Sequence, residues 1–327
     1  GALRLARRLE AEKSIAVDVL GVVEPVPVFD AGFLIALPEM ELYESRQAAL
    51  RGEIENQLEE ATGSRDAWPI SVEAGLPGPR IVKRAEDLKA DTILIGLGRH
   101  RPVDRVFGTE TALQVIRLSH IPVLAVPEES RDLPGSAALG VDFSHFSQKA
   151  ARAAIGLMKT QCDTHMVHVM SGMEFLPTMS EEWREDYEQE LKERLGDLAG
   201  GLPEEGACRI HLHVLEGEPA HELLGFTDER EVDLLVAGSH GHSFVGRLLM
   251  GSVSTRLIRG ARTPVLVIPP SEMTQEVIRQ EQPPGGEVHP WVGELREFSR
   301  ANAGRRTTLE LDDPEPVSYT HLRAHET

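Results

Sequence analysis

The chain has 327 residues, enough for about two domains of ordinary size, which excludes a peptide or a single small module. It carries 34 Lys and Arg against 53 Asp and Glu, and the formal net charge of −19 excludes nucleic acid as a partner bound through overall charge. Hydrophobic residues make up 41%, and no run approaches the roughly 20 apolar residues of a membrane span, so we expect no membrane partner. The two cysteines, Cys162 and Cys208, are too few for a disulfide framework, and a cytoplasmic location fits this count best.

Both ends of the chain have unusual features. A helical pattern follows Gly1 directly, with no initiator Met and no preceding strand, which favours a fragment that lacks its first strand. Residues 317–327 back-translate to a common sequencing adapter, and we interpret them as an artefact.

Strands and helices alternate along the chain. The first unit, residues 1–127, is predicted to have a helix at 1–12 and then strands at 15–23, 70–74, 92–95 and 123–126. After a charged linker at 128–136, the second unit, residues 137–270, is predicted to have strands at 137–141, 164–170, 210–215, 233–237 and 265–268, with helices between them. Residues 271–316 are interpreted as a linker leading into a truncated third domain. Such alternation, with apolar strands, predicts an α/β fold whose parallel sheets have helices on both faces.

The two units are copies of each other. Segment 70–82 aligns with segment 212–224, an offset of 142, and the same offset places Gly96 on Gly238. The chain is therefore predicted to be a tandem duplication.

A loop with three spaced glycines follows the fourth strand of the second unit. Gly238 is followed after two residues by Gly241, and after nine more by Gly251 and Ser252. Glycines allow positive φ and close approach of the main chain, so that successive N–H groups can point at an anion. Ser252 and Ser254 open the next helix, whose N-terminus favours phosphate. The pattern predicts a phosphate-binding loop that uses no lysine.

This spacing resembles the nucleotide-binding motif of the universal stress protein family, and the resemblance covers about residues 1–270 as a tandem pair. It implies two open five-stranded sheets of order 3-2-1-4-5, with the ligand at the switch point between strands one and four. It also implies that Asp142 lies beside an adenine nucleotide and that a main-chain group of Val169 meets the adenine. The residues that would hold the ribose and phosphates of ATP, which can carry Mg²⁺, are Gly238, Gly241, Gly251, Ser252 and Ser254.

The first unit departs from this motif. Arg99 and Thr109 replace the second and third glycines, and the strand that would supply the aspartate is missing. We therefore predict one nucleotide per chain, bound in the second unit, with the first unit as its structural partner in an intramolecular pseudo-dimer. A homodimer of the whole chain and the identity of any protein partner are left open.

The sequence is compatible with three functions. The leading hypothesis is a stress-response regulatory module in which ATP is a conformational ligand, because no strong general base flanks the glycine loop. The alternatives are an interaction scaffold independent of nucleotide and a slow ATP hydrolase that uses Asp142. No P-loop, dinucleotide fingerprint or nucleophile elbow is present. His211 and His213 share one face of a strand but lack a third ligand, so no metal site is predicted.

Overall fold

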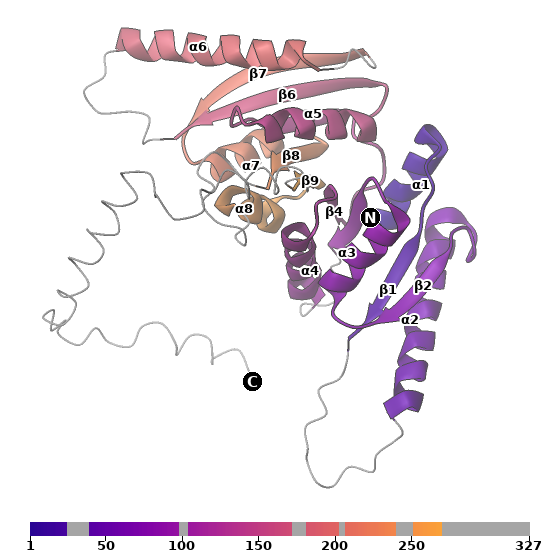
Figure 1. The fold of residues 1–327 in the computed structure, drawn as a ribbon. Coiled ribbons are helices and arrows are strands. Elements are labelled where there is room, and N and C mark those ends of the chain that lie inside the picture. Colours follow the sequence, from indigo (N-terminus) through magenta and orange to yellow (C-terminus); the bar gives the residue numbers. More distant parts are fainter. Residues whose placement is uncertain (25–38, 98–103, 172–180, 203–206, 240–250, 270–327) are drawn as a thin grey trace, which may run out of the picture. The chain divides into compact units, whose positions relative to one another are not determined.

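The computed structural model describes residues 1–24, 39–97, 104–171, 181–202, 207–239 and 251–269 (Figure 1). These ranges belong to the compact unit Gly1–Glu272, and the second unit, Met273–Thr327, lies outside them. The helices are α1 (Ala2–Lys13), α2 (Glu39–Thr62), α3 (Pro77–Leu88), α4 (Asp104–Leu118), α5 (His145–Leu157), α6 (Glu181–Gly200), α7 (Pro219–Glu229) and α8 (Ser252–Gly260). The strands are β1 (Val19–Val23), β2 (Ile70–Ala74), β3 (Ile93–Leu97), β4 (Val123–Pro127), β5 (Ser136–Gly140), β6 (Gln161–Met170), β7 (Ala207–Glu216), β8 (Leu234–Gly238) and β9 (Val265–Ile268).

The second repeat forms an open parallel sheet with the strand order 3-2-1-4-5. Its strands are neighbours in the order β7-β6-β5-β8-β9, so β5 pairs with β6 on one side and with β8 on the other. Every pairing among these five strands is parallel. The predicted fold class is confirmed, and a topological switch point lies between β5 and β8, where the chain turns to opposite sides of the sheet.

The first repeat has a gap where the second repeat has β5. β1 pairs with β2 in a separate two-stranded sheet, whereas β3 pairs with β4 inside the large sheet. In the described part of the chain no strand pairs with both β1 and β3. The prediction that the first unit lacks its first strand is thus confirmed.

The two repeats join through their last strands. β4 and β9 are antiparallel neighbours, with Leu124 opposite Leu266 and Ala125 opposite Val265. These four side chains are at most 1% exposed, so the junction lies inside the hydrophobic core. The ion pair between Arg259 Nη2 of α8 and Glu110 Oε1 of α4, at 2.7 Å, adds a polar contact between the repeats.

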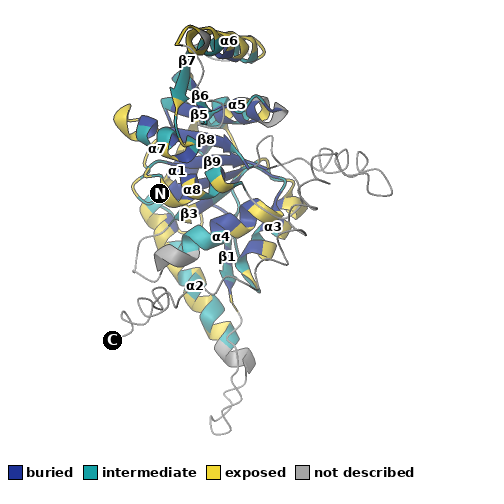
Figure 2. Cartoon of the chain, turned by 90° about the vertical axis from the view of Figure 1, so that its left-hand side faces the viewer, coloured by how far each residue is buried: buried dark blue, intermediate teal, exposed yellow. Residues whose placement is uncertain are grey.

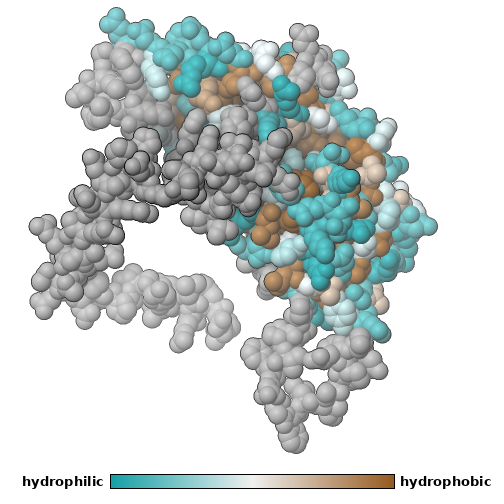
Figure 3. Space-filling view, viewed as in Figure 1, coloured by the Kyte–Doolittle hydropathy of each residue, from teal (hydrophilic) through white to brown (hydrophobic). Residues whose placement is uncertain are grey.

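Helices cover both faces of the large sheet. Leu195 of α6 packs with Met166 on one face, and Phe226 of α7 packs with Val167 and Leu257 on the other. The alternation of Met166 and Val167 between faces follows the two-residue period of a strand. Figure 2 shows the central strands buried and the outer side of α6 exposed. In Figure 3, hydrophilic residues cover the top of the view, where α6 lies, with hydrophobic residues beneath them.

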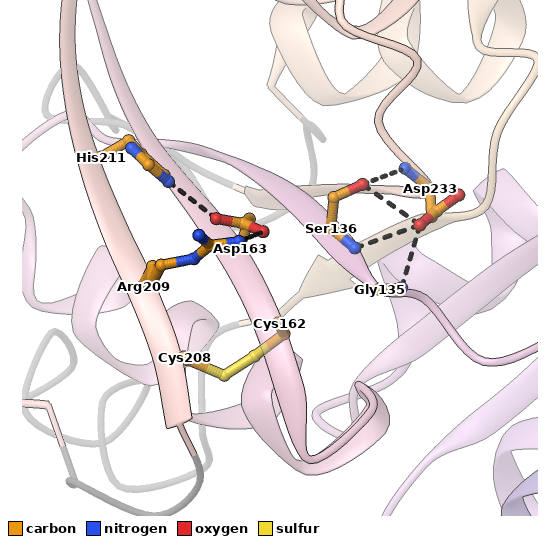
Figure 4. The surroundings of a disulfide bond; sticks show 8 residues. All are labelled: Gly135, Ser136, Cys162, Asp163, Cys208, Arg209, His211 and Asp233. Carbon is orange, nitrogen blue, oxygen red and sulfur yellow. Dashed lines mark hydrogen bonds and ion pairs between the residues drawn. A yellow bond between two sulfur atoms is a disulfide. The ribbon is translucent and has the colours of Figure 1, made fainter.

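A disulfide links Cys162 of β6 to Cys208 of β7 (Figure 4). The two residues are direct partners in the strand register, with their Cα atoms 4.4 Å apart, and 46 positions separate them in sequence. β6 and β7 each run over ten residues, longer than predicted, and the extra residues at their starts include both cysteines. A count of two cysteines gave no expectation of this bond, which depends on the register.

One carboxylate ties the start of β5 to the start of β8. Asp233 Oδ2 accepts hydrogen bonds from the main-chain N–H groups of Gly135 and Ser136, at 2.9 and 3.1 Å, and from Ser136 Oγ at 3.1 Å (Figure 4). The main-chain N–H of Asp233 donates back to Ser136 Oγ at 3.1 Å. This network fixes the amino ends of the two strands whose carboxyl ends form the candidate site.

Candidate functional site

The candidate site lies at the carboxyl ends of β5 and β8. These strands are parallel neighbours, with Leu139 opposite Val236, so their ends lie at the same edge of the sheet. Asp142 follows β5 by two residues, and Gly238 is the last residue of β8. The sheet therefore brings the predicted aspartate and the start of the glycine loop to the switch point, where ligands of open α/β sheets bind.

Asp142 is held by the first turn of α5. Its Oδ1 accepts hydrogen bonds from the main-chain N–H of Ser144 at 3.0 Å, from Ser144 Oγ at 2.6 Å and from Ser147 Oγ at 2.8 Å. Ser144 stands at the N-cap of α5, and its side chain makes no capping hydrogen bond, whereas its hydroxyl donates to Asp142 Oδ1. All three hydrogen bonds use one carboxylate oxygen, Oδ1.

The glycine loop is closed at its base by main-chain hydrogen bonds. The N–H of Gly251 donates to the carbonyl of Ser239 at 2.9 Å, and the N–H of Ser239 donates to the carbonyl of Ile268 at 2.9 Å. Gly251 has φ −56°, so positive φ is the wrong reason for a glycine at this position. A Cβ there would lie 3.0 Å from the Ser239 carbonyl oxygen, which is a tight contact, so the close approach of the main chain favours glycine. Gly241 falls in segment 240–250, outside the described residues.

The helix that follows the loop begins at the predicted serine. Gly251 is the N-cap of α8 and Ser252 its first residue, so the first N–H groups of this helix lie at the loop. Ser254 is 1% exposed, and its hydroxyl contacts the carbonyl oxygens of Ser239 and Gly251, each at 3.2 Å. Because a hydroxyl has only one proton, Ser254 donates to one of these carbonyls at a time or shares the proton between them, and either arrangement ties it to a residue that flanks segment 240–250.

The main chain of Val169 lies on the side of β6 that pairs with β5. The N–H of Val141, just past β5, donates to the carbonyl of Val167 at 2.9 Å. Neighbouring residues of a strand direct their main-chain groups to opposite sides, so Val169 directs its N–H and C=O to the same side as Val167, beyond the point where β5 ends.

The corresponding region of the first repeat is built differently. α4 begins at Asp104, well before the position that matches Ser252, so Thr109, the counterpart of Gly251, lies inside a helix. Arg99 lies outside the described residues.

A cluster of histidines lies on β6 and β7. The sequence did not reveal these residues as a group. His211 and His213 of β7 are joined by His165 of β6, whose Nδ1 is 3.0 Å from His213 Nε2. The ring of His165 stacks on His211 with centroids 4.8 Å apart, and His211 Nε2 is 2.8 Å from Asp163 Oδ1. Burial lowers the pKa of His213 to about 4, assisted by His165 and Arg230, and burial likewise lowers the pKa of His165. Knowledge of the β6–β7 register would have been needed to find this cluster.

Among the residues that the structure describes, no group of three or more His, Cys, Asp or Glu side chains could hold a metal ion. No described helix is long and apolar enough to cross a membrane.

Comparison with known proteins matches both repeats to the universal stress protein family, over residues 1–127 and 137–269. A universal stress protein of Methanocaldococcus jannaschii is 33% identical over 136 residues, which are 39% of this chain and 77% of the relative. A universal stress protein of Mycobacterium bovis is 25% identical over 292 residues, 81% of this chain and 90% of the relative. The crystal structure of a universal stress protein from Archaeoglobus fulgidus aligns with a TM-score of 0.54 at 21% identity, over 83% of this chain and 93% of that chain.

Proposed function

We propose that this chain, a tandem member of the universal stress protein family, binds one adenine nucleotide in its second repeat and uses it as a conformational ligand. The observation that carries the proposal is the arrangement at the switch point. There the Asp142 carboxylate, the main chain of Val169 and the Gly251-capped start of α8 lie at one edge of the sheet. Together they offer a contact to a base, a hydrogen-bond acceptor for a sugar and main-chain donors for phosphate.

The overall negative charge does not oppose this proposal. Hydrogen bonds to a charged group contribute about 1.5–3 kcal/mol each, whereas the field of distant carboxylates is screened beyond about 8 Å at physiological salt. The donors at the start of α8 are main-chain N–H groups, which carry no charge that a nearby acidic residue could neutralise. ATP is the form we expect, and Mg²⁺ would arrive with it, because this ion prefers phosphate oxygens and water to a cage of protein ligands.

The number of nucleotides per chain is the first test. Native mass spectrometry of the purified protein should show one adenine nucleotide per chain, and titration calorimetry with ATP should give a stoichiometry of one. Two nucleotides per chain would contradict the assignment of the first repeat as a structural partner. No binding of ATP, ADP or AMP would overturn the proposal.

A matched pair of glycine substitutions tests the loop. In Gly251→Ala, the new Cβ would lie 3.0 Å from the Ser239 carbonyl and must shift the loop, so we expect ATP affinity to fall by about tenfold or more. Gly225→Ala is the control, because a Cβ at Gly225 of α7 meets nothing within 4 Å and should leave affinity unchanged. Equal ATP affinities of the two variants would contradict a role of the glycine loop in nucleotide binding.

A second candidate function is an interaction scaffold that does not depend on nucleotide. The β4–β9 junction favours it, because this buried pairing makes a paired assembly out of a single chain. The substitution Gly251→Leu separates the two functions in cells that depend on the protein under stress. Loss of stress survival together with loss of ATP binding supports the nucleotide-dependent module, and retained survival supports the scaffold. Phosphate release that Asp142→Ala abolishes would instead support a slow hydrolase.

A further inference from the structure

The residue after Asp142 has an unusual backbone conformation. Phe143 has φ 60°, in the left-handed region that glycine adopts readily and that a bulky side chain rarely adopts. Strained residues of this kind persist only where their surroundings fix them, and they concentrate at functional sites. The side chains that contact Phe143 therefore show what keeps it in this conformation.

Two side chains from different elements hold the ring of Phe143. The ring centroid lies 4.6 Å from that of His168 on β6, and the guanidinium carbon of Arg194 on α6 lies 4.1 Å from the Phe143 centroid. Arg194 thus makes a cation–π contact with the aromatic ring. His168 is itself fixed, because its Nδ1 donates a hydrogen bond to the carbonyl of Val141 at 2.8 Å, and it is only 9% exposed.

These contacts surround the candidate carboxylate. Val141, before Asp142, is tied to β6 through its carbonyl, and Phe143, after it, is held by the contacts of its ring. A segment fixed on both sides leaves Asp142 little freedom to turn its carboxylate away from the crevice. A carboxylate already in its binding orientation avoids an ordering cost when the ligand arrives.

We propose that Phe143, His168 and Arg194 form an aromatic clamp that orients Asp142 and thereby sets the nucleotide affinity of the second repeat. The three are positioning residues that act through Asp142, and Arg194 makes α6 part of the control of the site. This inference rests on the proposed nucleotide-binding function.

The decisive variant is Phe143→Gly, because glycine tolerates the left-handed backbone while removing the ring. We expect Phe143→Gly to weaken ATP binding by about tenfold in calorimetry. Phe143→Tyr keeps the ring, so its affinity should stay within about twofold of the wild type. Arg194→Met should weaken binding by about threefold. Arg152→Met is its control, since Arg152 contacts the carbonyl of Gly201 at 3.2 Å and has no part in the clamp.

A double-mutant cycle distinguishes positioning from general structural damage. If the clamp acts through the carboxylate, Phe143→Gly should cost little further affinity in an Asp142→Asn background, whereas independent damage would add in full. Wild-type affinity in Phe143→Gly, or full additivity in the cycle, would overturn the clamp while leaving nucleotide binding intact. Failure of the wild-type protein to bind any adenine nucleotide would overturn the proposed function and the clamp with it.

Discussion

Acidification should weaken the fold through the histidine cluster at the β6–β7 edge. Burial lowers the pKa of His213 from its ordinary 6.5 to about 4. The unfolded chain then binds more protons than the folded one between these two values. The stabilising contribution is complete above about pH 6.5 and is lost as the pH falls toward 4. The lowered pKa of His165 acts in the same direction.

The geometry explains why the folded cluster resists protons. The contact of His165 Nδ1 with His213 Nε2 at 3.0 Å needs one nitrogen without a proton, so charging both rings breaks the hydrogen bond. Phe226 packs against both rings, Arg230 adds a positive charge, and the carboxylate of the cluster, Asp163, is engaged by His211. A proton added to His213 therefore lacks a free counter-charge among these neighbours.

The expected magnitude follows from the size of the shift. A single histidine with these two pKa values would lose about 2 kcal/mol of unfolding free energy between about pH 7.5 and about pH 5, and solvent screening of the partly exposed ring reduces this to about 1 kcal/mol. Urea denaturation over this range measures the effect. The lower limit of pH 5 keeps the assay above the titration of Asp163, whose pKa is lowered by hydrogen bonds from His211 and Arg209.

Two variants make this measurement specific. His213→Gln removes the titrating ring, so its free energy of unfolding should fall by about 1 kcal/mol less than that of the wild type over the same pH range. His221→Gln is the control, because His221 is an exposed residue of α7 outside the cluster and its loss should leave the pH slope unchanged. Parallel pH slopes for His213→Gln and the wild type would refute the reasoning.

Three further predictions concern stability measured by urea denaturation. Reduction of the Cys162–Cys208 bond should lower the free energy of unfolding by about 2–4 kcal/mol, because the bond closes a loop with a sequence separation of 46, and a variant with both cysteines changed to Ala should not respond to reductant. Asp233→Ala should cost about 1–3 kcal/mol, since three hydrogen bonds lose their acceptor, and an unchanged midpoint would show that water replaces it. Leu195 is 0% exposed, and Leu195→Ala should lower the free energy of unfolding by about 2–5 kcal/mol. Its control is Glu193→Ala at an exposed position of the same helix, which should change this free energy by no more than about 0.5 kcal/mol. Equal losses in the two variants would contradict the assignment of Leu195 to the core.

The fold could be predicted because its signals are local or repeat along the chain. Alternation of apolar strands with helices, found twice at one offset, predicted a tandem pair of parallel α/β units, and the strand order followed from the resemblance to the universal stress protein family. The same topology predicted that Asp142 and Gly238 would end neighbouring strands. The spacing of the loop glycines located Gly251, but its close approach to the Ser239 carbonyl depends on the three-dimensional structure.

The remaining features depend on long-range partners. The pairing of Cys162 with Cys208 needs the β6–β7 register, and a shift of one residue would turn one sulfur to the other face. The left-handed backbone of Phe143 occurs where an arginine from α6 and a histidine from β6 contact its ring, and neither residue is close to it in sequence. Hydrogen bonds at Asp142 that occupy a single oxygen are likewise a matter of atomic geometry.

The antiparallel contact of β4 with β9 pairs the two repeats within one chain. Between two separate chains such a contact would dissociate on dilution, so its occupancy would follow the amount of protein present. Within a single chain the covalent connection keeps the effective concentration of one repeat around the other constant. The pairing should therefore be insensitive to expression level, and its two halves always occur in equal number.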